Sequence, residues 1–219
     1  MFVRLGRKGI SFVIELGELT IFGAASLGSL FHQRHIFEKL TRSIYEIGVR
    51  CIPITLIVGL FTGLVLGLQL YYVLTNFSSE SLLGQAVALS IIMEIGPVFT
   101  AIMIVGQAGS ALSAEIGIQR NAEQIDALQT MNINPLAFLV SPRLYAALIC
   151  FPILTAFFDI VGIYGGHLTG VSMLGVDQGA YWSRIYEAVS VKNVMDGFCK
   201  ALTFGILTTV ICAFQGYYT

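Results

Sequence analysis

The chain has 219 residues, of which 56% are hydrophobic and only 11% are charged, with 12 Lys and Arg against 13 Asp and Glu. Soluble domains carry about 25% charged residues, so the composition excludes an ordinary soluble enzyme, a nucleic-acid-binding protein and a disordered chain. Residues 51–79 and 95–114 are free of charge, and roughly 20 apolar residues suffice to cross a bilayer core. Because these runs do not alternate with period two, they exclude a β-barrel. The sequence therefore predicts an all-α, polytopic helical membrane protein.

The first 50 residues are amphipathic, and we expect them to form interfacial helices that precede a transmembrane domain over residues 51–219. Residues 2–31 are mostly apolar but carry Glu15 and Glu18 on one helical face. This pattern is typical of a helix that lies in the membrane interface, with a full crossing as the alternative. Residues 32–50 predict a second amphipathic helix. Seven of the 12 basic residues fall in the first 50, which favours a cytoplasmic N-terminus.

Four membrane spans follow, and they are predicted at residues 51–75, 82–112, 144–168 and 194–214. A polar segment separates the second span from the third and predicts a cytoplasmic helix at about residues 118–131. Such a helix could dock a soluble partner, although an ordinary solvated face would have the same composition.

Two spans carry glycine at every fourth position. Small residues at this spacing let helices approach closely within a membrane. The pattern fits tight packing alone, or a packed face that slides or opens during transport. The residues are Gly59, Gly63 and Gly67 in the first span and Gly162, Gly166 and Gly170 in the third.

Three charged residues, Glu94, Asp159 and Lys200, lie well inside predicted spans. A helix rises about 1.5 Å per residue, which places all three in the outer half of the membrane, near enough for long side chains to meet. One interpretation is an ion pair that fixes helix register, and another is a polar patch that receives a charged lipid headgroup. A third is proton relay, which would make the chain an ion-coupled secondary transporter that uses Glu94 and Asp159.

The sequence has no Walker A loop, no hydrolase or metalloprotease motif and no dinucleotide glycine motif. We therefore expect no catalytic residue, no metal site and no bound cofactor in this chain.

A series of motifs runs through the middle of the sequence: Glu94-Ile-Gly-Pro97, Gly106-Gln-Ala-Gly-Ser-Ala111, Ala114-Glu-Ile-Gly117, Arg120-Asn-Ala-Glu-Gln-Ile-Asp-Ala-Leu128, Asn134-Pro135 and Ser141-Pro-Arg143. Two further stretches, Gly63-Leu-Val-Leu-Gly-Leu-Gln69 and Val161-Gly-Ile-Tyr-Gly-Gly166, flank it. Together these motifs resemble the MlaE permease family over about residues 5–218.

The resemblance implies a permease subunit of an ABC transporter in a bacterial inner membrane, which moves phospholipids between the inner and outer membranes and so maintains outer-membrane lipid asymmetry. The implied partners are a second copy of the chain, cytoplasmic ATPase subunits that bind the ATP, a STAS-domain subunit and periplasmic MCE-domain subunits. The resemblance also implies that the loop helix couples to the ATPase through four residues, Arg120, Glu123, Gln124 and Asp126.

We expect acyl chains to contact one face of the first span, at Leu66, Leu70, Val73 and Phe77, with Glu94 and Lys200 nearer the headgroup. A packed or lipid-facing helix would show the same spacing. The chain departs from some relatives at Met93, where they have arginine, which leaves Lys200 as the nearest cation. The family also has a fifth span beyond the segment that matches residues 216–218, so the resemblance implies four of five spans here.

Overall fold

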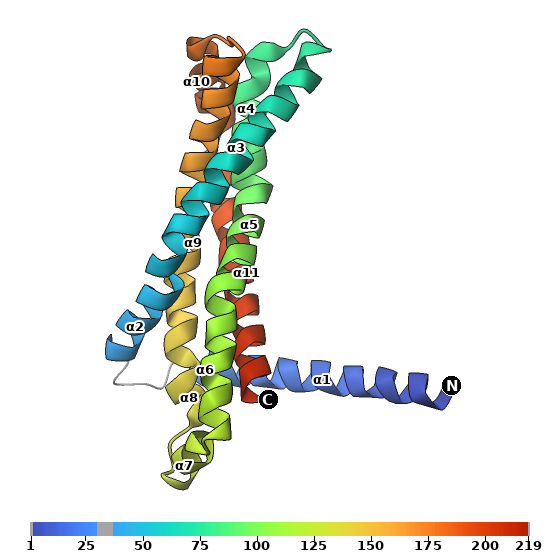
Figure 1. Cartoon of the computed structure of the whole chain (residues 1–219), viewed down its shortest axis with the longest axis vertical. Coiled ribbons are helices and arrows are strands. Elements are labelled where there is room, and N and C mark those ends of the chain that lie inside the picture. Colours follow the sequence, from blue (N-terminus) through green and yellow to red (C-terminus); the bar gives the residue numbers. More distant parts are fainter. Residues whose placement is uncertain (1, 30–36, 219) are drawn as a thin grey trace.

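A computed structural model describes residues 2–29 and 37–218 of the chain (Figure 1). Within these ranges all regular structure is helical. The α-helices are α1 Phe2–Ser29, α2 Phe37–Ile47, α3 Ile52–Thr75, α4 Leu83–Ser90, α5 Gly96–Ile104, α6 Ser110–Asn121, α7 Gln124–Thr130, α8 Pro135–Leu139, α9 Ser141–His167, α10 Gln178–Ala188 and α11 Val191–Tyr217.

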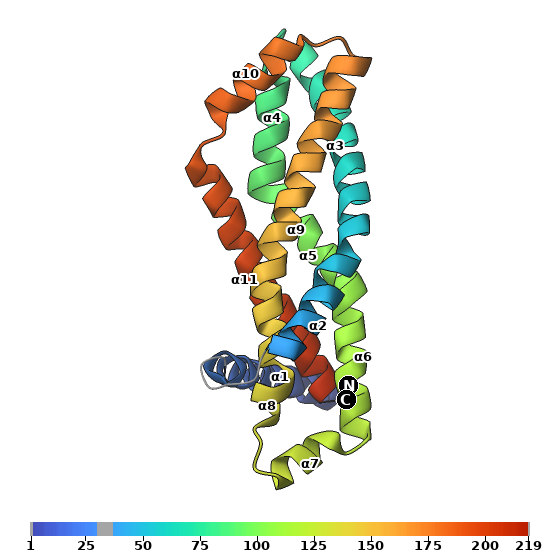
Figure 2. The same cartoon turned by 90° about the vertical axis from the view of Figure 1, so that its left-hand side faces the viewer.

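Among the described residues, four helical segments are long and apolar enough to cross a membrane, which confirms the predicted fold class. Helix α2 leads into α3 through a short 3-10 turn at Val49–Cys51, so the first segment begins well before residue 51. The α3 helix then crosses α9 along the length of the bundle (Figures 1 and 2). The four segments are Lys39–Thr75, Glu80–Asn121, Pro135–Met173 and Val191–Tyr217.

Helix α1 lies across one end of the bundle, roughly at right angles to the long helices (Figure 1). The ring of Phe22 anchors it there, with ring centroids 5.7 Å from Phe214 and 5.6 Å from Tyr217 of α11. Although α1 has 28 residues, it is not among the four segments suited to cross a membrane. This placement is the one that an interfacial helix requires.

The second span is not a continuous α-helix. Wide π-helical turns at Ile91–Ile95 and Val105–Gly109 separate α4, α5 and α6, and a third π turn, Leu168–Met173, follows α9. Pro97, which lacks a backbone N–H, sits in the first turn of α5 and is therefore accommodated by the helix start. Such π turns often occur at functional sites.

The polar segment after α6 folds differently from the predicted helix over residues 118–131. Helix α6 ends at Asn121, and Glu123 adopts a left-handed conformation with φ of 55° before the seven-residue α7 begins. Helix α8 follows, with the Asn134 side chain accepting a hydrogen bond of 3.0 Å from Leu136 N. The predicted single helix is therefore two pieces joined by a turn, and α7 lies at the tip of the bundle (Figure 1).

Candidate transport site

The long helices α3 and α9 meet through glycines. The backbone of Gly63 lies directly against Gly162, and Gly67 lies against Gly166 one turn further along. The hydroxyl of Thr169 donates a hydrogen bond of 3.1 Å across this contact to the carbonyl of Leu64. An added Cβ at Gly63 would overlap the backbone of Gly162, and one at Gly67 would be tightly confined, so these glycines allow the two helices to approach this closely.

The remaining glycines of the pattern have different neighbours. Gly59 lies against Phe158 of α9, but Gly170 lies against the side chains of Leu83 and Tyr181, from α4 and α10. Added Cβ atoms at Gly162 and Gly166 would likewise meet the second span, at Ile91 and Val87, so Gly170 continues the same row of glycines.

Two of the three predicted intramembrane charges come together. Lys200 Nζ lies 2.6 Å from Glu94 Oε1 and donates a second hydrogen bond, of 2.8 Å, to the carbonyl of Met93. Glu94 projects from the first π turn of the second span, and Lys200 comes from α11. The Glu94 side chain is 68% exposed and that of Lys200 is 40% exposed. An exposed ion pair within two spans is costly against hydrocarbon, so this surface suits a polar occupant or a polar cavity.

The third charge, Asp159, has separate surroundings. Its side chain is buried between α9 and α5, where Oδ1 lies against Gly96. Within the described residues Oδ1 has no hydrogen-bond partner. Asp159 is thus not part of the Glu94–Lys200 pair.

The four side chains predicted to contact acyl chains lie in two environments. Leu66 and Leu70 are partly buried and pack on the core between α3, α4, α9 and α10. Val73 and Phe77 are exposed, at 48% and 74%, near the end of α3. Val73 and Phe77 are therefore the more exposed of the four.

The predicted coupling residues cluster around the turn before α7. Arg120 pairs with Asp126 across the turn, with 2.7 Å between Nη1 and Oδ1. Glu123 and Gln124 are exposed, whereas Ile125 is fully buried and anchors α7 to the bundle. Two of the four residues therefore stabilise the loop, and Glu123 and Gln124 are the freer polar groups on its surface.

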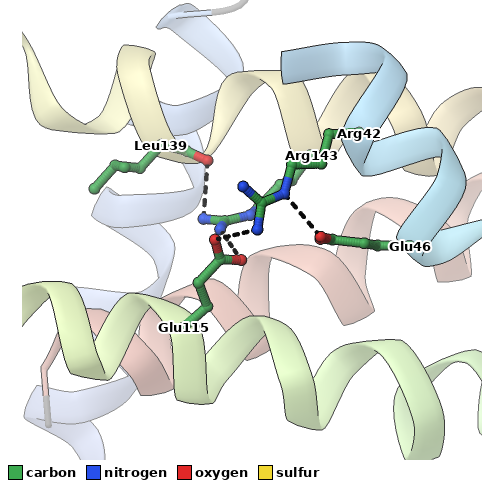
Figure 3. Close-up of polar contacts among 5 residues, drawn as sticks. All are labelled: Arg42, Glu46, Glu115, Leu139 and Arg143. Carbon is green, nitrogen blue, oxygen red and sulfur yellow. Dashed lines mark hydrogen bonds and ion pairs between the residues drawn. The ribbon is translucent and has the colours of Figure 1, made fainter. Parts of the chain in front are cut away.

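Sequence reasoning missed a cluster of four charged residues, Arg42, Glu46, Glu115 and Arg143, which joins α2, α6 and α9 (Figure 3). Arg143 Nη2 lies 2.5 Å from Glu115 Oε2, and Nη1 donates a hydrogen bond of 3.2 Å to the carbonyl of Leu139. Arg42 lies between two carboxylates, 2.9 Å from Glu46 Oε1 and 3.8 Å from Glu115 Oε1.

The sequence held one signal for this charge cluster. Glu115 and Arg143 stand at the two ends of the polar segment between the second and third spans, where an ion pair would close the loop at its base. Because Glu115 and Arg143 are far apart in the sequence, their spacing did not predict that they pair with each other.

Comparisons with known proteins point in one direction. Residues 40–219 match a family model described as permease MlaE. The intermembrane phospholipid transport system permease protein MlaE of Haemophilus influenzae is 43% identical over 97% of this chain and 82% of the relative. A probable ABC transporter permease protein of Rickettsia conorii is 34% identical over 98% of this chain and 83% of the relative. A probable ABC transporter permease protein of Synechocystis is 31% identical over 82% of this chain and 67% of the relative.

Proposed function

The chain belongs to the MlaE permease family, and from that premise we propose that it moves phospholipids between the inner and outer membranes as the membrane subunit of an ABC transporter. The name of the Haemophilus relative supports this substrate. In a bacterium with two membranes, the activity would maintain the lipid asymmetry of the outer membrane. Within this proposal the chain sits in the inner membrane with its N-terminus in the cytoplasm, as the basic residues near that end favour.

The Glu94–Lys200 pair is the observation that best supports a lipid substrate. It places a cation and an anion side by side on an exposed surface within the spans. A zwitterionic headgroup offers the matching pair of charges, with its phosphate facing Lys200 and its amine facing Glu94. Acyl chains would contact Leu66, Leu70 and the exposed Val73 and Phe77, on α3 and just after it, as the sequence pattern predicts.

The permease would work as a homodimer with cytoplasmic ATPase subunits, which bind the ATP, a STAS-domain subunit, and MCE-domain subunits on the periplasmic side. The exposed Glu123 and Gln124 at the tip of the bundle suit docking of the ATPase, and the Arg120–Asp126 pair holds that tip in shape. Closure of the ATPases on ATP would move the tip. The long helices could then carry the motion to the lipid surface.

Purification from native membranes in mild detergent tests these partners. We expect an ATPase and an MCE-domain protein to co-purify, and Glu123→Lys to release the ATPase because it reverses a charge at the docking tip. Glu187→Lys is the matched control, since Glu187 is an exposed glutamate on α10 at the opposite end of the bundle. Intact wild-type protein that carries no ATPase would contradict the proposal.

An ion-coupled secondary transporter has weaker support. Glu94 is engaged by Lys200, and Asp159 is buried against Gly96, so the two acids do not form a shared relay within the described residues. Transport by the purified chain in a proton gradient, without ATPase or ATP, would be the result that favours this alternative.

A further inference from the structure

We propose that this chain has a second lipid site, a cavity beside the charge cluster that binds a phosphate-bearing headgroup. The cavity lies between α2, α6, α8 and the start of α9, and it has a volume of about 170 Å3. A second cavity of about 180 Å3 adjoins it and shares the walls formed by Ser43, Glu46, Glu115 and Arg143. A single buried water needs about 10–15 Å3 on the same measure, so the space exceeds what one bridging water needs.

The charge of the cavity favours an anion. Three cations, Lys39, Arg42 and Arg143, line it against two carboxylates, Glu46 and Glu115. The adjoining cavity adds a further cation without adding a carboxylate. Arg42 pairs with Glu46 and Arg143 pairs with Glu115, which leaves the charge of one cation uncompensated in the lining of the first cavity.

Lys39 is the cation that most clearly lacks a counter-ion. Its Nζ lies 2.7 Å from the centre of the Phe138 ring, and none of the ion pairs between described residues includes it. A ring face attracts an ammonium group, but the interaction is weaker than a hydrogen-bonded ion pair. Lys39 is therefore available for a phosphate oxygen that enters the cavity.

The walls of the cavity suit a lipid better than a free ion. Phe138, Leu139 and Pro142 give one side an apolar surface that could contact the glycerol and the first acyl carbons. The Gln119 Oε1 atom is buried without a hydrogen-bond partner in the described part of the chain. An unsatisfied buried acceptor is unfavourable, and the hydroxyl or amine of a headgroup would satisfy it.

The position of the cavity along the bundle also agrees with a lipid headgroup as its occupant. Helix α1 runs across the same end of the bundle and contacts α8 and α9, two of the helices that bound the cavity (Figure 2). An amphipathic helix in that orientation marks the level of the lipid headgroups. The site is thus separate from the Glu94–Lys200 pair, and it depends on the proposed function only in that the chain is embedded in a bilayer.

Binding of fluorescent phosphatidylglycerol to the purified complex in detergent tests this site. All variants carry Lys200→Gln, so that the Glu94–Lys200 surface contributes little. We expect Lys39→Gln to weaken binding by about tenfold, because one charge-assisted hydrogen bond contributes about that much, and Lys39→Arg to retain it. Arg184→Gln is the control, since this arginine is on α10 at the far end. A thermal melt of each variant checks that it is folded.

Three results would overturn the proposal. Unchanged affinity in folded Lys39→Gln would show that the cavity does not bind the lipid. Equal losses in Lys39→Gln and Arg184→Gln would show a general effect of surface charge. Complete displacement of the lipid by excess inorganic phosphate would identify a site for free phosphate. None of these results bears on ATP-driven transport, which can fail or succeed independently of them.

Discussion

Replacing Gly63 with alanine should destabilise the protein, because the added Cβ would overlap the backbone of Gly162 on α9. Overpacking of this kind costs about 1–3 kcal/mol, and a clash with backbone belongs at the upper end, since no side chain can rotate away. Alanine in place of glycine within a helix returns about 0.5–1 kcal/mol. The net loss is therefore about 2 kcal/mol.

Gly106→Ala is the matched control within the second span. A Cβ at Gly106 would have no neighbouring atom within 4 Å, so only the gain of about 0.5–1 kcal/mol in helix formation applies. One kcal/mol shifts the melting temperature of a chain of this size by about 2–4 °C. We expect Gly63→Ala to melt about 4–8 °C below the wild type and Gly106→Ala slightly above it.

Fluorescence of Trp182, the one tryptophan of the chain, reports this transition in detergent. Its ring lies 5.7 Å from that of Tyr181 on α10, and Tyr181 packs on the third span, so loss of helix packing changes its surroundings. If Gly63→Ala melted at the same temperature as Gly106→Ala, the close approach of α3 and α9 would be wrong.

Three further variants test other parts of the structure. Glu115→Gln should lower stability by about 2–3 kcal/mol in the same melt, because it leaves the nearly buried Arg143 without its closest carboxylate. This loss lies between the values for exposed and for buried ion pairs. An unchanged melting temperature would refute the pairing. Tyr181→Phe removes a hydrogen bond of 3.0 Å to Ile163 O and should cost about 0.5–1.5 kcal/mol. Burial raises the pKa of the Tyr181 hydroxyl in the folded protein. The hydroxyl therefore contributes its full stability below the unfolded-state pKa of about 10, and this contribution is lost as the pH rises toward the folded-state pKa. Identical stability profiles of wild type and Tyr181→Phe above pH about 10 would contradict this. Lys200→Gln should lower the stability of the fold by no more than about 1 kcal/mol, because its ion pair with Glu94 is partly exposed. The same change should lower phospholipid transport about tenfold. A large loss of stability with intact transport would instead make the pair a structural one.

Long uncharged runs made the four spans predictable, because hydrocarbon tolerates almost no exposed polar backbone or charge. The same constraint singled out Glu94 and Lys200 as charges that need a partner, and helix rise placed them at a similar depth. The family resemblance, rather than physical chemistry, suggested the substrate and the docking role of residues near Glu123.

Other features depended on tertiary structure and left no periodic signal. The π turns at Ile91–Ile95 and Leu168–Met173 interrupt the α-helical register, because a wider turn rotates the residues that follow it. A regular pattern of 3.6 residues per turn cannot anticipate this rotation. The pairing of Glu115 with Arg143 depends on how the loop closes, and the sequence shows only that both residues stand at its ends.

The proposed function of this chain is phospholipid transport under the control of an ATPase. The most direct measurement is the transfer of a headgroup-labelled phospholipid by the purified complex in reconstituted vesicles, with and without ATP, for the wild type and for Lys200→Gln. We predict transfer that requires ATP and is largely lost in the variant. Transfer that proceeds equally without ATP, or an active wild-type ATPase that moves no lipid, would contradict the account.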